Sequence, residues 1–92
     1  MSTRTKPWYL YVLRCSDDTF YTGVTTNINR RLHEHNNTPK GAKYTRSRRP
    51  VELIYSLTFS SQSTAQAAEA QFKKMSRKQK SMMIFGMKNE KG

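Results

Sequence analysis

The sequence predicts an α+β fold, in which a small three-stranded antiparallel sheet is flanked by helices in the order β-β-α-β-α-α. Three observations carry this prediction: two strand-like segments joined by a turn, a third such segment after a loop with Pro and Gly, and two capped helical segments at the end. The 92 residues allow one domain, with a thin core, because a chain this short buries only about 60–65% of its unfolded surface. We predict the domain over residues 8–85, with flexible ends at residues 1–7 and 86–92.

The first two strands are predicted to form a hairpin. Residues 8–13 are aromatic and β-branched without polar alternation, which favours a strand covered on both faces. Residues 16–19 (Ser-Asp-Asp-Thr) supply turn chemistry, because short acceptor side chains bond the local backbone. Residues 20–24 then form the second strand, and Gly23 near its end permits the close approach of another backbone.

The first helix is predicted from an N-cap at Thr26 to about Asn36. Ile28, Leu32 and His35 recur at helical spacing and form one stripe, which indicates the face turned toward the sheet.

A basic loop and a third strand follow. Residues 37–50 contain two prolines and a glycine and are predicted as a long loop, and residues 51–59 are predicted as a strand. Residues 60–63 form a polar connector. The loop has no acidic residue, and its basic residues are Lys40, Lys43, Arg46, Arg48 and Arg49.

Two serine–glutamine pairs with capping-box spacing predict the last two helices. The first pair begins at Ser63 and opens an alanine-rich helix to about Met75. The second begins at Ser76 and opens a helix to about Phe85, where Gly86 is placed to end it.

The charge predicts a polyanionic partner. There are 17 Lys and Arg against 6 Asp and Glu, for a formal net charge of +11. Such an excess costs self-repulsion, which a bound polyanion relieves. Nucleic acid is the first candidate, and an anionic membrane surface or ribosomal RNA comes next.

Cysteine usage and the N-terminal segment predict a cytoplasmic protein. The single Cys15 cannot close an internal disulfide, and one thiol cannot build a zinc cluster. Residues 1–7 are polar and basic with no apolar region after them, and no apolar run approaches membrane-spanning length. We therefore expect no membrane partner.

The scarce carboxylates direct attention to Glu69. Turn chemistry explains Asp17 and Asp18, and Glu34 can pair with Arg31 on a helix surface. Glu69 lies among alanines, where a lone acid at a cleft can offer oxygen ligands to Mg²⁺ or Mn²⁺. The helical spacing alone favours an ordinary i,i+4 pair with the lysine at position 73. So few acids argue against a two-metal nuclease, and one divalent metal at most fits.

Four further residues are candidates for phosphate chemistry. Arg31 lies one helical turn before His35, and its guanidinium could bind a phosphate bidentately or belong to a solvated basic face. Alone, His35 would more often be a helix-end residue satisfied by carbonyl groups. Tyr11 and Tyr21 would most often be core aromatics, and a phenol with a pKa of about 10 is a poor base unless a cation lowers it. Tyr44 could stack on a base or anchor the loop.

These segments together resemble the GIY-YIG nuclease domain, and more closely the small stand-alone bacterial subgroup of that superfamily. The resemblance spans residues 8–84 and is carried by Tyr9-Leu10-Tyr11, Tyr21-Thr22-Gly23, Arg31, the basic segment 41–50 and Glu69. Tyr9-Leu10 stands where the family name has Gly-Ile, which leaves Tyr11 intact.

The resemblance implies an endonuclease-like enzyme that hydrolyses DNA phosphodiesters with one Mg²⁺ or Mn²⁺. Glu69 would bind the metal, Arg31 would hold the phosphate, Tyr11 and Tyr21 would position or deprotonate the attacking water, and His35 would assist proton transfer. Tyr9 and Gly23 would be structural members of the motifs. The predicted nucleic-acid contacts are Lys40, Lys43, Tyr44, Arg46, Arg48, Arg49, Lys73, Lys74, Arg77 and Lys78.

Two other functions remain open. A basic domain of this kind could hold branched, nicked or single-stranded DNA, or RNA, without cutting it. Alternatively, the methionine-rich segment 82–87 could dock a protein partner or a second copy, although in so small a chain it is more often core.

Overall fold

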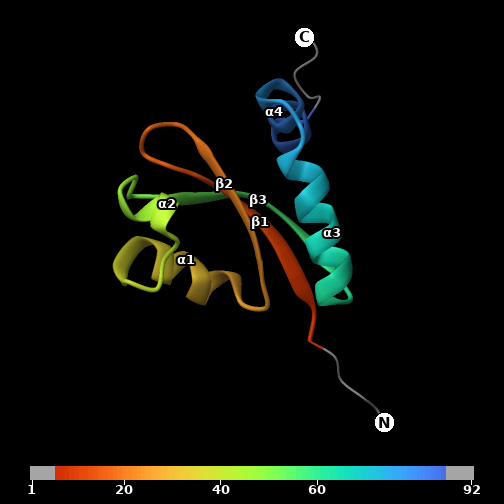
Figure 1. Cartoon of the computed structure of the whole chain (residues 1–92), viewed down its shortest axis with the longest axis horizontal. Helices are drawn as coiled ribbons and strands as arrows, with labels where there is room; N and C mark the ends of the chain where they lie inside the picture. The colour runs from red at the N-terminus through yellow and green to blue at the C-terminus, as the bar shows by residue number, and fades with distance from the viewer. Residues whose placement is uncertain (1–5, 87–92) are drawn as a thin grey trace.

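The computed structural model describes residues 6–86, and these form the predicted α+β fold (Figure 1). The predicted flexible ends lie outside the described residues, apart from residues 6, 7 and 86. The elements, in chain order, are β1 (Trp8–Arg14), β2 (Phe20–Thr25), α1 (Ile28–Asn37), α2 (Lys43–Arg46), β3 (Glu52–Phe59), α3 (Gln62–Lys73) and α4 (Arg77–Phe85).

The sheet is antiparallel, and β1 is its central strand in the order β2-β1-β3. In its register Tyr11 lies opposite Gly23 on β2 and opposite Ser56 on β3. The β1–β3 register shifts between Val12 and Leu13, where the ladder is irregular. The Asp17 side chain accepts hydrogen bonds from the Thr19 amide and hydroxyl groups, which confirms the predicted turn chemistry.

Helices cover both faces of the sheet, as the unbroken apolar run of β1 predicted. In Figure 1, α1 and α2 lie on one side of the strands and α3 and α4 on the other. Successive side chains of β1 point to opposite faces of the sheet. Leu10 and Val12 pack with Phe72 of α3, whereas Tyr11 and Leu13 form a second buried cluster against which Leu32 of α1 packs.

Two details around the first helix differ from prediction. The N-cap is Asn27 rather than Thr26, because the Asn27 side chain accepts from the Arg30 amide. The predicted loop contains the four-residue helix α2, which begins where the Ala42 carbonyl accepts from the Thr45 and Arg46 amides. The element order is therefore β-β-α-α-β-α-α.

The third helix begins earlier than predicted. Ser61, not Ser63, is the N-cap of α3, because its hydroxyl accepts from the Thr64 amide. The predicted capping box at Ser76 is confirmed, and Gly86 ends α4 with a φ of 78°, which a residue without Cβ adopts at no steric cost.

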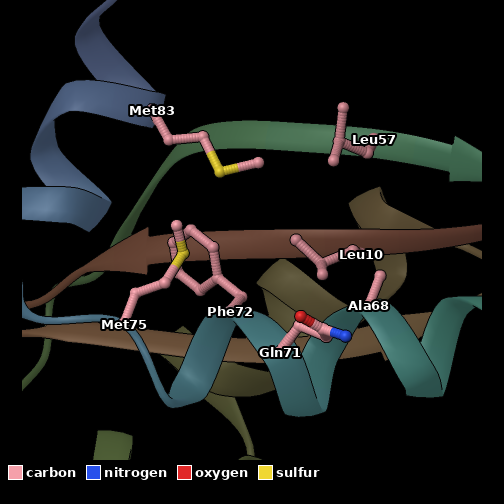
Figure 2. Close-up of a pocket in the computed structure, with 7 residues that line it drawn as sticks. All are labelled: Leu10, Leu57, Ala68, Gln71, Phe72, Met75 and Met83. Carbon is pink, nitrogen blue, oxygen red and sulfur yellow. The ribbon is translucent and has the colours of Figure 1, made fainter.

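An apolar groove of about 280 Å³ lies between β3, α3 and α4 (Figure 2). Figure 2 shows Met83 of α4 and Leu57 of β3 facing Phe72 and Met75 across it. Met82, Met83 and Phe85 are exposed, so part of the methionine-rich segment lies at the surface rather than in the core. None of the helices between residues 6 and 86 has the length and apolar character that a bilayer crossing needs.

Candidate active site

Gly23 makes room for the hydroxyl group of Tyr11. A Cβ at Gly23 would lie 2.5 Å from the Tyr11 hydroxyl oxygen and 2.7 Å from the ring carbon that bears it. The close approach expected at Gly23 is therefore made by a side chain from the neighbouring strand. This places a tyrosine hydroxyl over the middle of β2, on the α1 side of the sheet.

We expect Gly23→Ala to displace the Tyr11 ring and to lower the free energy of unfolding by about 1–3 kcal/mol, the usual cost of overpacking. Chemical denaturation of the variant measures this change. Ser60→Ala, at an exposed position between β3 and α3, is a control that should leave both the stability and the Tyr11 environment nearly unchanged. A Gly23→Ala variant as stable as the parent, with unchanged Tyr11 NMR shifts, would contradict this role.

A buried chain of hydrogen bonds joins Tyr11 to α1 and α2. The Tyr11 hydroxyl lies 2.9 Å from His35 Nε2, and His35 Nδ1 lies 2.8 Å from Thr45 Oγ1. The Thr45 hydroxyl in turn donates to the Ala42 carbonyl at 3.0 Å. His35 is therefore satisfied by side chains from two other elements, rather than by the carbonyl groups expected of a helix-end histidine.

Aromatic rings surround this chain. The Tyr21 ring meets the His35 ring edge-on at 5.2 Å between centroids and lies 6.5 Å from the Tyr11 ring. Tyr44 stacks on Tyr21 at 5.9 Å, and the Arg48 guanidinium lies 3.9 Å from the Tyr44 ring centroid. The structure thus brings together both predicted tyrosines and His35, and Tyr44 anchors its loop on them.

Burial opposes ionisation of both central groups. Burial raises the pKa of Tyr11 to about 12, although interaction with the Arg31 guanidinium works in the other direction. Burial, reinforced by the positive charge of Arg31, lowers the pKa of His35 to about 4. Near neutral pH the pair is therefore a neutral phenol beside a neutral imidazole.

Arg31 is held at the rim of this cluster. Its guanidinium donates to the Glu34 carboxylate at 2.9 Å and to the Lys40 carbonyl at 2.9 Å. The predicted pairing of Arg31 with Glu34 is thus confirmed, while the charge of Arg31 still acts on both Tyr11 and His35. Both bonds are made by Nη1, and the Arg31 side chain is 27% exposed.

Glu69 lies on the sheet-facing stripe of α3. Ala65 and Phe72, four residues before and three after it, are buried against the sheet, and the Glu69 side chain is 20% exposed. Its carboxylate pairs with Lys73 at 3.0 Å, as the helical spacing favoured. Although α3 covers the face opposite α1, the Glu69 charge is among those that raise the pKa of Tyr11.

The predicted nucleic-acid contacts divide into two groups. Arg48 pairs with Asp17, and Arg49 donates to the carbonyl groups of His35 and Glu34 at the end of α1. Arg77 and Lys73 also have carboxylate partners. Five other predicted cations are exposed and have no ion pair among residues 6–86: Lys40, Lys43, Arg46, Lys74 and Lys78.

Sequence reasoning missed the residues that support His35 from α2. Thr45 is fully buried, and its role depends on contacts with a residue ten positions earlier. Gly41 allows this return of the chain, because a Cβ there would lie 2.8 Å from the Glu34 carbonyl oxygen and from the His35 Cα. The one local signal was the Ala42–Thr45 spacing of a single helical turn.

A second open hollow, of about 350 Å³, lies beside Tyr9 and the first turn of α1. Tyr9 is two residues before Tyr11 on β1 and therefore shares its side of the sheet. Neither this hollow nor the apolar groove is lined by Tyr11, Arg31, His35 or Glu69.

Comparisons with known proteins agree on one family. Residues 7–82 match the GIY-YIG catalytic domain. A UPF0213 protein of Streptococcus agalactiae serotype V is 56% identical over 84 residues, which cover 91% of this chain and 94% of the relative. The UPF0213 protein YazA of Bacillus subtilis is 45% identical over 83 residues, covering 90% of this chain and 83% of the relative.

Two solved structures share the fold. The solution NMR structure of a protein from E. faecalis matches with a TM-score of 0.61 and 47% identity, covering 92% of this chain and 88% of that chain. The solution NMR structure of a UPF0213 protein from Bacillus halodurans matches with a TM-score of 0.56 and 39% identity, covering 86% of this chain and 83% of that chain. The chain therefore belongs to the GIY-YIG nuclease superfamily, and within it to the UPF0213 proteins.

Proposed function

We propose that this protein is an endonuclease that hydrolyses DNA phosphodiester bonds with the help of one divalent metal ion. The observation that carries the proposal is the buried Tyr11–His35 hydrogen bond beside the Arg31 guanidinium, whose charge acts on both groups. A phenol, an imidazole and a fixed guanidinium are the groups that orient water and hold a phosphate.

Arg31 is assigned the phosphate. Its contacts with Glu34 and the Lys40 carbonyl hold the guanidinium in place before substrate binds. A preorganised cation stabilises the charge that builds on the phosphoryl oxygens in the transition state, and it costs no reorganisation at that moment.

Tyr11 and Tyr21 are assigned the attacking water, with His35 behind Tyr11. A phenol whose pKa is about 12 does not act as a base at neutral pH. Tyr11 therefore orients water through its oxygen while its hydroxyl group bonds His35 Nε2. Tyr21, whose ring lies against His35, fills the adjoining side of the site.

Glu69 is assigned the metal ion. Residues 6–86 contain no cluster of three or more His, Cys, Asp or Glu side chains, so a caged metal centre does not fit these residues. Mg²⁺ is often held by one carboxylate together with water and substrate phosphates, and Glu69 needs only to leave its exposed partner Lys73 to provide that carboxylate. The bound ion would supply the acidity that the neutral phenol and imidazole lack.

We assign to the exposed cations of segment 40–46 the role of contacting the phosphates of the nucleic-acid backbone. Replacing Lys40, Lys43 and Arg46 together with alanine should reduce the slope of log K against log salt by about 2–3, because each phosphate contact contributes about 0.7–0.9. Filter binding between low and moderate salt measures this. Arg49→Ala is the contrasting variant: since Arg49 bonds backbone carbonyls of α1, it should lower the melting temperature and leave the slope nearly unchanged.

The test of the function is cleavage of labelled branched, nicked and single-stranded DNA in Mg²⁺, Mn²⁺ or EDTA. We expect products that require the metal and that disappear in Arg31→Ala. DNA that is bound but uncut under every condition, with the same salt dependence, would refute the enzyme.

A second function, DNA or RNA binding without cleavage, has one observation in its favour. Tyr11 is 3% exposed and His35 is fully buried, and burial of both suits a structural hydrogen bond as well as a catalytic one. The same cleavage experiment separates the two functions, because only the enzyme yields metal-dependent products.

The exposed part of the methionine-rich segment gives the chain a surface suited to self-association or to a protein partner. Gel filtration at two concentrations tests self-association, and an unchanged monomer at both would exclude it.

A further inference from the structure

We propose that Thr45 is a positioning residue, which fixes the tautomer of His35 so that Nε2 accepts the hydroxyl hydrogen of Tyr11. The tautomer assignment stands on the hydrogen-bond geometry alone, and its catalytic meaning rests on the proposed nuclease function.

The three side chains form a closed polar chain inside the protein. His35 and Thr45 are fully buried, and Tyr11 is 3% exposed. The consecutive distances are 2.9 Å from Tyr11 to His35, 2.8 Å from His35 to Thr45, and 3.0 Å from Thr45 to the Ala42 carbonyl. Buried polar groups with so few partners must each be satisfied by a specific donor or acceptor, so the direction of every bond is constrained.

The carbonyl at the end of the chain sets that direction. A carbonyl oxygen only accepts, so the Thr45 hydroxyl donates to Ala42. The Thr45 oxygen then accepts from His35 Nδ1, which must carry the ring hydrogen. His35 Nε2 is left with its lone pair, and the Tyr11 hydroxyl donates to it.

The opposite direction leaves the more deeply buried group without a partner. With the hydrogen on Nε2, His35 would donate to Tyr11, and the Tyr11 hydroxyl would have no acceptor within the part of the chain that the structure describes. That direction would let the Ala42 amide donate to Nδ1, but over 3.4 Å, which is long for such a bond. Ala42 is only partly buried, whereas Tyr11 is 3% exposed, so we assign the direction that satisfies the Tyr11 hydroxyl.

Backbone contacts hold Thr45 in this position. The Ala42 carbonyl accepts from the Thr45 amide as well as from its hydroxyl, which ties the side chain to the first turn of α2. Gly41 lies against the backbone of α1, and Arg49 donates to the carbonyl of His35 itself at 2.6 Å. The segment after α1 is thus folded back so that Thr45 meets the ring.

The consequence for the proposed site is an oriented phenol. Because the Tyr11 hydroxyl donates its hydrogen to His35, the lone pairs of the Tyr11 oxygen can accept a hydrogen bond from the attacking water. This role needs a neutral imidazole, and burial together with Arg31 holds the pKa of His35 to about 4. Without Thr45, the ring could adopt either tautomer, and Tyr11 would lose a fixed orientation.

The test is the tautomer of His35, measured by ¹⁵N NMR on histidine-labelled protein at neutral pH. His33 is the other of the two histidines, and a His33→Gln variant assigns the signals. We expect the parent protein to carry its hydrogen on Nδ1, Thr45→Val to populate the Nε2–H tautomer, and Thr45→Ser to restore the parent spectrum. Thr58→Val, at an exposed position of β3, is the matched control and should change nothing.

Cleavage kinetics supply the second readout. Thr45→Val should lower kcat about tenfold at unchanged affinity for DNA, and Thr45→Ser should recover it. If the parent protein carries the hydrogen on Nε2, the proposal is wrong, even if Thr45→Val does not fold. A Thr45→Val variant with the shifted tautomer and an unchanged kcat would also overturn it. The expected tautomers in a protein that cuts no DNA would refute the nuclease function and leave the assignment of His35 standing.

Discussion

Arg31→Ala is expected to lower the rate of DNA cleavage by about 10²–10³-fold, the usual cost of removing one preorganised charge-stabilising donor. Among residues 6–86, Arg31 is the one guanidinium whose charge acts on both Tyr11 and His35. The variant loses a partly buried ion pair with Glu34 and one bond to the Lys40 carbonyl, which together should cost about 1–2 kcal/mol in stability. Single-turnover cleavage with saturating protein measures the chemical step.

The preceding arginine supplies a matched control. Arg30 carries the same charge on the same helix, but its side chain is 60% exposed. Its guanidinium lies 3.9 Å from the Glu34 carboxylate, farther than that of Arg31. Arg30→Ala removes an equal charge, so it should weaken DNA binding slightly and leave the single-turnover rate nearly unchanged. Equal losses in the two variants would mean that Arg31 contributes only general positive charge.

Glu69→Gln is expected to raise the Mn²⁺ concentration for half-maximal cleavage more than about tenfold, or to abolish metal-dependent cleavage altogether. Changes to residues that merely support a metal ligand typically cost 10–100-fold in metal affinity, and loss of the ligand's charge should cost at least as much. The substitution keeps the shape of the side chain and gives up only an ion pair with the exposed Lys73. Titrating Mn²⁺ against the initial rate checks the prediction.

Glu52→Gln is the control for that experiment. Glu52 pairs with Arg14 at 2.7 Å on the surface of the sheet, and its side chain is 60% exposed. The Glu52→Gln variant should need the same Mn²⁺ concentration for half-maximal cleavage as the parent protein. DNA binding should persist in both variants. If Glu69→Gln followed the parent titration curve, Glu69 would be only the partner of Lys73.

Local signals along the chain predict some element boundaries and not others. The box at Ser76 and the stop at Gly86 were predictable, because each depends on residues within one turn. Near the start of α3, both Ser61 and Ser63 could act as the N-cap. The Thr64 amide donates to the Ser61 hydroxyl, and residue spacing alone does not predict this choice. Helix α2 is too short to show periodicity, and its buried Thr45 is held by α1.

The grouping of the candidate site residues was also predictable only in part. The pattern of Tyr11, Tyr21, Arg31 and His35 was readable because strand pairing and helix spacing bring such residues to one side of a sheet. The sequence did not reveal that burial outweighs Arg31 and raises the pKa of Tyr11, because burial depends on the packing of α1 and α2. Nor did it separate the loop cations that face solvent from Arg49, which instead bonds the backbone.

A crystal soaked in Mn²⁺ tests most directly whether Glu69 and Arg31 serve the same site as Tyr11 and His35. We predict an anomalous peak at the Glu69 carboxylate, on its Tyr11 side, with Lys73 displaced and the Arg31 guanidinium facing the same space. A carboxylate still paired with Lys73 at saturating Mn²⁺, or a metal bound only elsewhere, would contradict the one-metal nuclease.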